Sequence, residues 1–146
     1  MEYVGNDVTV FCAAWWDDSV DRREVDGVTY RAVCDRPAAG TFAARLPSAL
    51  VRVRPDVVHA AASPPAAVAS ARAAATALRV PLLVDWWATH PADRPAAYRR
   101  VARLPAMVTA PSRLAATEAR EYGVPDDRVT VVPEPVDYDC VRAAPV

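Results

Sequence analysis

Arg54-Pro55-Asp56-Val57-Val58-His59-Ala60 is the stretch that decides the fold of this chain. Pro55 restricts its own φ and Asp56 can bond nearby backbone amides, so a turn precedes the apolar run that begins at Val57. The run shows no polar alternation, as expected of a short strand that is buried on both faces of a parallel sheet. The stretch therefore predicts a central strand ending on His59, at the sheet edge where α/β proteins gather their ligands.

The residues after this strand alternate between helical and strand patterns. A helix rich in alanine is expected to run to Leu78, with Ser63 as its N-cap and Pro64 at its first position. Further helices are expected at 95–104 and from the Ser112 cap to Tyr122, and further strands at 81–85, 106–110 and 129–133. Because helices that join parallel strands form right-handed crossovers, this pattern predicts a Rossmann-like parallel sheet with flanking helices.

The residues before the stretch add two strands and a helix to this prediction. Strands are expected at 8–14 and 28–33, the second after an Asp26-Gly27 turn, with a charged loop through Glu24 between them. Residues 41–53 have helical spacing, but Pro47 should kink that helix or divide it into two turns. Residues 1–4 would be the last turn of a helix that Gly5 caps.

The composition predicts one soluble domain. A chain of 146 residues can bury roughly 70% of its unfolded surface in a single core. Its 17 basic residues, all arginine, balance 18 acidic ones, which argues against nucleic acid as a partner. The three cysteines are too few and too far apart for a zinc site or a disulfide framework, so we expect reduced thiols in the cytoplasm. No signal-peptide pattern and no apolar run that could span a bilayer is present in the sequence.

Six short strings follow one another along the chain in a recognisable order. They are Gly5-Asn6-Asp7-Val8-Thr9-Val10, Asp26-Gly27-Val28, the opening stretch from Arg54 to Ala60, Ala110-Pro111-Ser112, Gly123-Val124-Pro125-Asp126-Asp127-Arg128-Val129 and Val132-Pro133-Glu134-Pro135-Val136-Asp137. No single string is specific, but together they resemble the acceptor-side, N-terminal domain of family 4 glycosyltransferases, which have the GT-B fold. The resemblance covers nearly the whole chain.

This resemblance implies half of an enzyme. Residues 1–137 would form the acceptor-side domain and 138–146 the start of an interdomain linker. In that family a second domain holds the nucleotide-sugar, and a hexose is transferred with retention between the two domains. The donor-side E-x7-E motif is absent, since no two glutamates here are eight positions apart. We therefore expect the acceptor to be a sugar or a lipid-linked molecule, and we expect no metal and no cofactor in this chain. A nucleotide-sugar donor is expected only with a C-terminal domain, so the chain in isolation should be inactive.

The resemblance also implies a missing strand. Family members usually start with a strand and a glycine-rich loop, and that strand would lie between the strands at 8–14 and 56–60. Its loss should leave two buried edges of unpaired N–H and C=O groups, or force those two strands to pair directly. A truncated gene, a misplaced start, or a half-enzyme that depends on a separate donor-binding domain or a second copy would each explain this.

Candidate site residues follow the predicted strands, and each has a structural alternative. His59 can bond a sugar hydroxyl or a phosphate, or it can be a structural histidine bonded to backbone. Asp85, Trp86 and Trp87 suit sugar binding, because sugar faces stack on indoles while carboxylates accept hydroxyl protons; core packing is the alternative. Many relatives carry a histidine where this chain has Ala61 and another where it has Trp87. His90 can take the place of the histidine that Trp87 replaces only if the loop that contains His90 folds back.

The remaining candidates lie further along the chain. Ser112 and Arg113, at a helix N-terminus, can receive a phosphate, but N-capping is the simpler explanation for Ser112. Glu134 would face the interdomain cleft or be an exposed linker residue. The arginines at 99, 100 and 103 and at 22 and 23 are most simply solvated faces, with peripheral contact to the inner membrane face as the alternative.

Two classes of function thus remain in competition. The first is the acceptor-binding half of a retaining hexosyl transferase, with its catalytic residues unknown. The second is a non-enzymatic Rossmann-like binding module or a degenerate gene fragment, which the missing loop and the substituted histidine positions favour.

Overall fold

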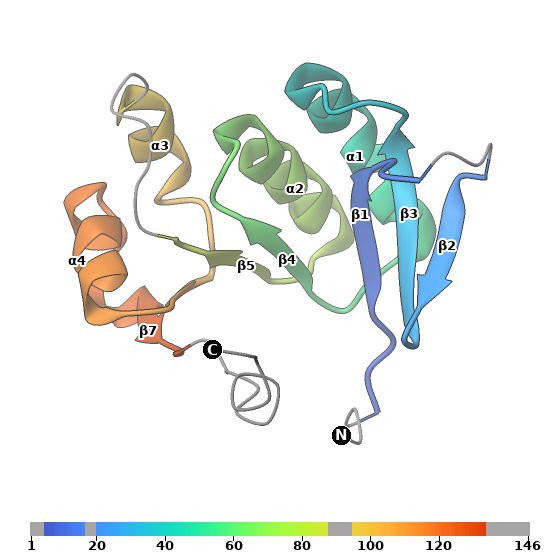
Figure 1. Cartoon of the computed structure of the whole chain (residues 1–146). Helices are drawn as coiled ribbons and strands as arrows, with labels where there is room; N and C mark the ends of the chain where they lie inside the picture. Colours follow the sequence, from blue (N-terminus) through green and yellow to red (C-terminus); the bar gives the residue numbers. More distant parts are fainter. Residues whose placement is uncertain (1–4, 17–19, 88–94, 134–146) are drawn as a thin grey trace, which may run out of the picture.

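The computed structural model describes residues 5–16, 20–87 and 95–133. Within them the strands form two sheets (Figure 1). Sheet A has the order β1-β3-β2, from β1 (Thr9–Ala13), β2 (Arg22–Val25) and β3 (Val28–Cys34). Sheet B has the order β4-β5-β6-β7, from β4 (Val58–Ala61), β5 (Leu82–Asp85), β6 (Met107–Ala110) and β7 (Val129–Val131).

Helices alternate with the strands of sheet B, which are all parallel. The helices are α1 (Ala39–Val53), α2 (Pro65–Leu78), α3 (Pro95–Val101) and α4 (Arg113–Glu121), with a short 3-10 turn η1 (Asp126–Arg128) before β7. This arrangement confirms the predicted Rossmann-like α/β fold. In the described part of the chain, no helix is both long and apolar enough to cross a membrane.

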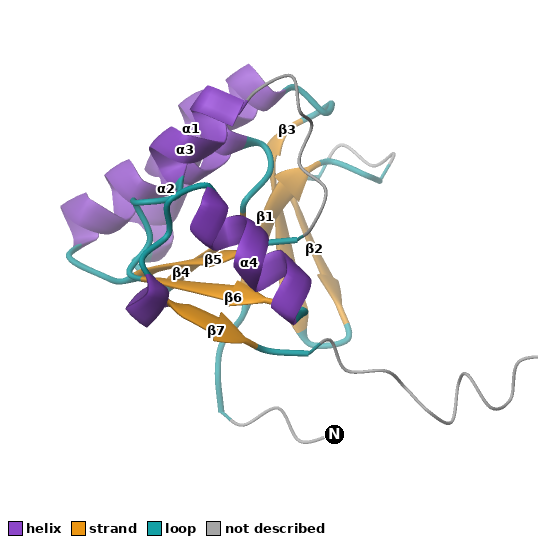
Figure 2. Ribbon diagram, turned by 90° about the vertical axis from the view of Figure 1, so that its left-hand side faces the viewer, coloured by secondary structure: helices purple, strands orange, loops and turns teal. Residues whose placement is uncertain are grey.

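One face of sheet B is open, which corrects the expectation of a strand buried on both faces. Along β4, Val58 is buried whereas His59 and Ala61 are exposed, and along β5, Val84 is buried whereas Asp85 is half-buried. The described helices all lie on the side of the buried residues (Figures 1 and 2). Consecutive strands joined by right-handed crossovers place their helices on the same face, and so the other face remains accessible.

β1 and β4 belong to different sheets, so the two strands do not pair directly as one expectation allowed. Each is the last strand of its sheet on the side facing the other. The residues whose backbone groups point away from the neighbouring strands are Thr9, Phe11 and Ala13 on β1 and His59 and Ala61 on β4. As whole residues they are half-buried or exposed, so neither edge consists of fully buried residues.

The charged segment before the Asp26-Gly27 turn is a strand rather than a loop. β2 pairs antiparallel with β3, and Asp26 and Gly27 both have positive φ, as a tight hairpin requires. All residues of β2 are exposed. The alternation of apolar residues that reveals a strand therefore cannot be seen in this segment.

Pro47 does not divide α1, and another helix supplies the hydrogen bond that proline cannot. A residue at position 47 would normally donate its N–H to the carbonyl of Ala43, and proline has no N–H. In the structure the Ser70 hydroxyl of α2 donates to that same carbonyl oxygen. The contact between α1 and α2 thus keeps α1 continuous across its proline.

The boundaries of the later helices differ in detail from the prediction. α2 begins one residue later than expected, with Pro64 at the N-cap and Pro65 at the first position. Ser63 does not cap it, and its oxygen instead accepts from the Tyr98 hydroxyl at 3.2 Å. α3 ends at Val101 rather than at Leu104. The Ser112 cap of α4 is confirmed, as its side chain accepts from the backbone N–H of Ala115 at 3.2 Å.

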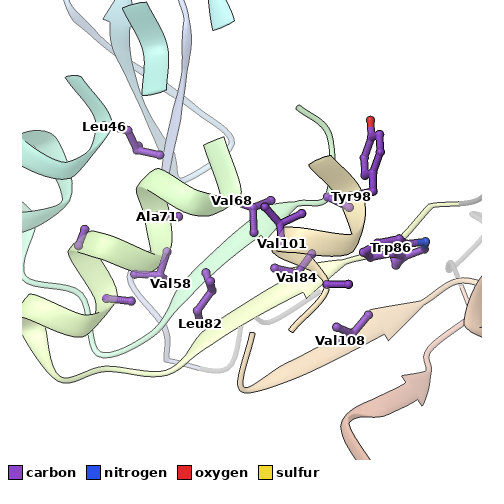
Figure 3. Packing of buried hydrophobic residues seen from close by; sticks show 14 of the residues in the cluster. Leu46, Val58, Val68, Ala71, Leu82, Val84, Trp86, Tyr98, Val101 and Val108 are labelled. Atoms are coloured by element: carbon purple, nitrogen blue, oxygen red, sulfur yellow. The ribbon is translucent and has the colours of Figure 1, made fainter. Parts of the chain in front are cut away.

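The core lies between sheet B and its helices and extends to sheet A (Figure 3). Val58, Leu82 and Val84 of β4 and β5 pack on the side of α2, whose alanines permit a close approach, and Val108 of β6 belongs to the same cluster. Val33 of β3 belongs to the same cluster. One continuous core therefore joins the two sheets through the layer formed by α1 and α2.

Candidate functional site

His59 and Asp85 lie side by side on the open face of sheet B. The β4/β5 register places His59 opposite Leu83, so Asp85 is its diagonal neighbour on the same face. The Nε2 atom of His59 lies 3.0 Å from Oδ2 of Asp85, with the side chains 52% and 40% exposed. Two of the candidates that the sequence places on separate strands therefore form one accessible cluster.

Thr109 completes this cluster from the next strand. It pairs in register with Asp85, and its hydroxyl donates to Oδ1 of that carboxylate. Each oxygen of Asp85 thus has a neighbour of its own, Thr109 on one side and His59 on the other. We refer to His59, Asp85 and Thr109 as the open-face cluster.

The cluster defines which nitrogen of His59 is available to a ligand. A carboxylate can only accept hydrogen bonds, so the Nε2 atom facing Asp85 carries the hydrogen. In the neutral imidazole Nδ1 is then an acceptor, which can receive a hydrogen bond or a proton from a hydroxyl group. Asp85 and Thr109 hold the ring in this state without themselves having to touch the ligand.

The two tryptophans after β5 have different environments. Trp86 is 1% exposed and packs edge-on against Tyr98, with ring centroids 6.2 Å apart (Figure 3). Its ring is tilted relative to that of Tyr122, with centroids 5.5 Å apart. Trp86 is therefore part of the core, and we leave it out of the proposed sugar-binding surface. Trp87 is 51% exposed and follows the carboxyl end of β5, so it remains available for stacking.

Ser112 and Arg113 follow β6 at the same edge of the sheet. Both side chains are exposed, but the Ser112 oxygen already accepts the Ala115 amide as the cap of α4. The structural alternative for Ser112 therefore accounts for its contact. His90 and Glu134, like the linker residues 138–146, lie outside the described residues.

The described residues hold no group of three or more histidine, cysteine or acidic side chains arranged for a metal ion. The open-face cluster offers one imidazole nitrogen and one carboxylate. Its chemistry is that of hydrogen bonding and proton exchange with hydroxyl groups.

Thr109 was missed by the sequence reasoning, although a signal was present. It is the only polar residue in the expected strand at 106–110, and it stands one position before the end of that strand. A polar residue in a buried parallel strand lies on the accessible face or bonds a neighbour. Its partner, however, follows only from the β5/β6 register.

Comparisons with known proteins identify the relatives of this chain. Residues 2–139 match the family described as Glycosyltransferase Family 4. Among solved structures, Anabaena HepE in complex with UDP superposes with a TM-score of 0.58 at 16% identity, over 75% of this chain and 32% of that one. HepE in complex with UDP-glucose gives a TM-score of 0.59 at 15% identity, over 75% and 31%. The chain thus spans about a third of HepE, and no curated protein matches it significantly.

Proposed function

This chain belongs to glycosyltransferase family 4, and we propose that it is the acceptor-binding half of a retaining, nucleotide-sugar-dependent hexosyl transferase. The observation that supports this role is the open-face cluster, a histidine oriented by Asp85 and Thr109 on an accessible sheet face. The donor would be a nucleoside diphosphate sugar, as in the complex of HepE with UDP-glucose. The acceptor would be a sugar or a lipid-linked sugar.

The cluster would act on a hydroxyl of the acceptor. Nδ1 of His59 accepts that hydrogen bond, Asp85 fixes the ring, and Trp87 offers an exposed indole face for the apolar side of a sugar ring. The sequence has no pair of glutamates eight positions apart, which is the donor-side motif that the family resemblance implies. We therefore propose that transfer requires a donor-binding half in addition to residues 1–146.

A sugar-transfer assay tests this proposal. The chain is incubated with UDP-glucose and a panel of saccharide and lipid-linked acceptors, with and without a separately expressed C-terminal half of a family 4 glycosyltransferase. We expect no transfer by the chain alone and transfer when both halves are present, with the α configuration of the donor kept in the product by NMR. Transfer by the isolated chain would refute the half-enzyme role.

Variants separate the cluster from general effects on the fold. His59→Ala and Asp85→Asn should each lower the transfer rate by about tenfold to a hundredfold, as expected for the loss of a hydrogen bond to a charged or catalytic group. Ser48→Ala should leave the rate unchanged, because Ser48 is exposed and donates to the Arg45 carbonyl of its own helix. Saccharide binding without transfer in any combination would favour the non-enzymatic binding module.

A further inference from the structure

An arginine-lined hollow lies on sheet A, away from the open-face cluster. It has a volume of about 200 Å³ and lies between the sheet and the last turns of α1. Its walls include Arg22 of β2, Arg31 of β3 and Arg52 of α1, together with Phe11, Ala49 and Asp21. None of the residues that line it belongs to the open-face cluster.

The hairpin register brings the arginines together. Arg22 and Arg31 are directly opposite each other in the antiparallel β2/β3 pair, so both side chains project from the same face. Like charges at such a position destabilise a sheet unless a counter-charge is close. Three arginines and one aspartate line the hollow, which leaves a formal excess of two positive charges.

Arg31 supplies an observation that is independent of the charge count. Its Nε atom is buried, and among the described residues it has no hydrogen-bond partner. A buried guanidinium donor without an acceptor is costly, because the group has lost its water and gained nothing in return. Arg22, by contrast, is exposed and donates to the Thr29 hydroxyl at 3.4 Å, which holds its guanidinium over the hairpin.

We propose that this hollow binds a phosphate group, as free phosphate or as the monoester of a larger molecule. A phosphate monoester carries a charge of about −1.5 to −2 near neutral pH, which balances the excess charge, whereas a single carboxylate would balance only half of it. The planar guanidinium fork suits bidentate bonds to phosphate oxygens. The volume of the hollow is several times the ~30 Å³ that a water molecule occupies in the liquid. The hollow therefore also has room for atoms attached to the phosphate.

NMR of arginine side chains tests the proposal directly. The protein is labelled with ¹⁵N-arginine and titrated with inorganic phosphate at constant ionic strength, and the Nε–H signals are followed. The Arg31 signal, identified by its loss in Arg31→Gln, should shift saturably. Arg31→Gln and Arg52→Gln should each weaken phosphate binding about tenfold or more, as for the loss of a charge-assisted hydrogen bond.

Arg23→Gln is the matched control. Arg23 is adjacent to Arg22 on β2 but projects to the other face, where its guanidinium lies over the Trp15 ring at 5.8 Å. This variant removes one positive charge from the same strand and should bind phosphate as the wild type does. Equal weakening by Arg23→Gln, or an Arg31 signal that does not shift, would overturn the proposal. Arg52 is exposed on its helix, so Arg52→Gln remains informative if Arg31→Gln fails to fold.

Two further arms identify the source of the phosphate. Glycerol 3-phosphate is added in place of inorganic phosphate, and sedimentation is measured with phosphatidylcholine vesicles that contain phosphatidic acid. Glycerol 3-phosphate binding without vesicle binding indicates a soluble monoester. Vesicle binding that inorganic phosphate displaces, and that Arg52→Gln but not Arg23→Gln weakens, indicates a lipid headgroup. Failure of inorganic phosphate, glycerol 3-phosphate and vesicles alike would contradict the proposal.

Discussion

The strand register decides which charged and hydrogen-bonding side chains lie next to one another in this protein. On sheet B the register forms the open-face cluster, where Asp85 lies between His59 and Thr109. On sheet A the β2/β3 register sets Arg22 opposite Arg31, and the β1/β3 register places Cys12 one position from the partner of Cys34. In both sheets neighbouring strands supply residues that are distant in the sequence, and each environment changes what the side chain can do.

Cys12 gives a prediction at this scale. Its half-buried thiol contacts the Arg31 carbonyl, with Sγ and O 3.9 Å apart, and burial raises the pKa of the thiol, with a smaller contribution from the neighbouring Cys34. Since the thiolate is the reactive form, alkylation of Cys12 should reach half its maximal rate at a higher pH than in an unfolded peptide. Iodoacetamide labelling followed by mass spectrometry measures this profile.

Linkage fixes the sign of the accompanying change in stability. The folded protein holds the Cys12 proton to a higher pH than the unfolded chain does, so the free energy of unfolding should fall as pH rises beyond about 8.5 toward the folded-state pKa. Cys34→Ser should move the alkylation midpoint downward by removing the smaller contribution. A midpoint at or below that of the peptide would contradict the prediction.

At the scale of elements, α1 is continuous because α2 lies against it. The proline within α1 removes one hydrogen bond of the helix, and the Ser70 hydroxyl compensates from the neighbouring helix. Local sequence rules treat a helix as isolated and therefore predict a break. The break is avoided by a contact between residues 27 positions apart.

Removal of that hydroxyl tests this explanation. Ser70→Ala leaves the Ala43 carbonyl without its donor, and we expect the free energy of unfolding to fall by about 1 kcal/mol or somewhat more. Urea unfolding followed by circular dichroism measures the change. Ser48→Ala is the control, because Ser48 is exposed and bonds a carbonyl within α1, and it should be nearly neutral. A similar loss in both variants would show that the Ser70 bond has no special role.

The strand edges at β1 and β4 provide a second prediction at this scale. Along β1 the N–H groups of Val10 and Cys12 point toward β3, whereas that of Phe11 points away; along β4 the N–H of Ala60 points toward β5, whereas that of His59 points away. Amide hydrogen exchange measured by NMR should therefore alternate along both strands, fast at Phe11 and His59 and slow at their neighbours. Uniform protection would show that these edges are covered.

For the whole molecule, the joint between the two sheets is a helix pair rather than a strand ladder. α1 covers sheet A and packs along α2, which covers β4 and β5. The alanines of α2 allow this close approach, and Ala74 shares the face of Ser70 because it follows four residues later. The two sheets should therefore depend on one tightly packed helix contact.

A larger side chain at that contact should weaken the whole fold. Ala74 is 2% exposed, so Ala74→Leu should lower the free energy of unfolding by about 1–3 kcal/mol through overpacking. Urea unfolding gives the total, and hydrogen exchange at β3 and β5 shows whether both sheets lose protection together. Ala73→Leu, at an exposed position of the same helix, should change little. An effect of equal size there would assign the loss to helix propensity or solubility rather than to packing.

Local signals in the sequence determined most of the elements. The apolar runs around Val58, Val84 and Val108, the Ser112 cap and the glycine at 123 with φ of 105° place strands and helix ends by short-range chemistry. The order of these elements along the chain then gave a parallel α/β fold, since crossover handedness leaves few alternatives. His59 and Asp85 could be named as candidates because the sequence predicts both at strand ends. Asp85 does end β5, whereas His59 is the second residue of β4.

Tertiary structure alone decided how these elements share contacts. Thr109 donates to Asp85 from the neighbouring strand, and Ser70 of α2 donates to the carbonyl that Pro47 leaves without a donor in α1. The hollow on sheet A is lined by arginines from β2, β3 and α1. No local pattern in the sequence links the residues of these contacts. The open face of sheet B likewise depends on where the helices pack, because burial on one face or on both leaves the same short apolar runs in the sequence. Local sequence determined the helices and strands because caps, turns and apolar runs act between residues that are close in the chain. Register and packing decided the sites because each site is built from side chains of several helices or strands.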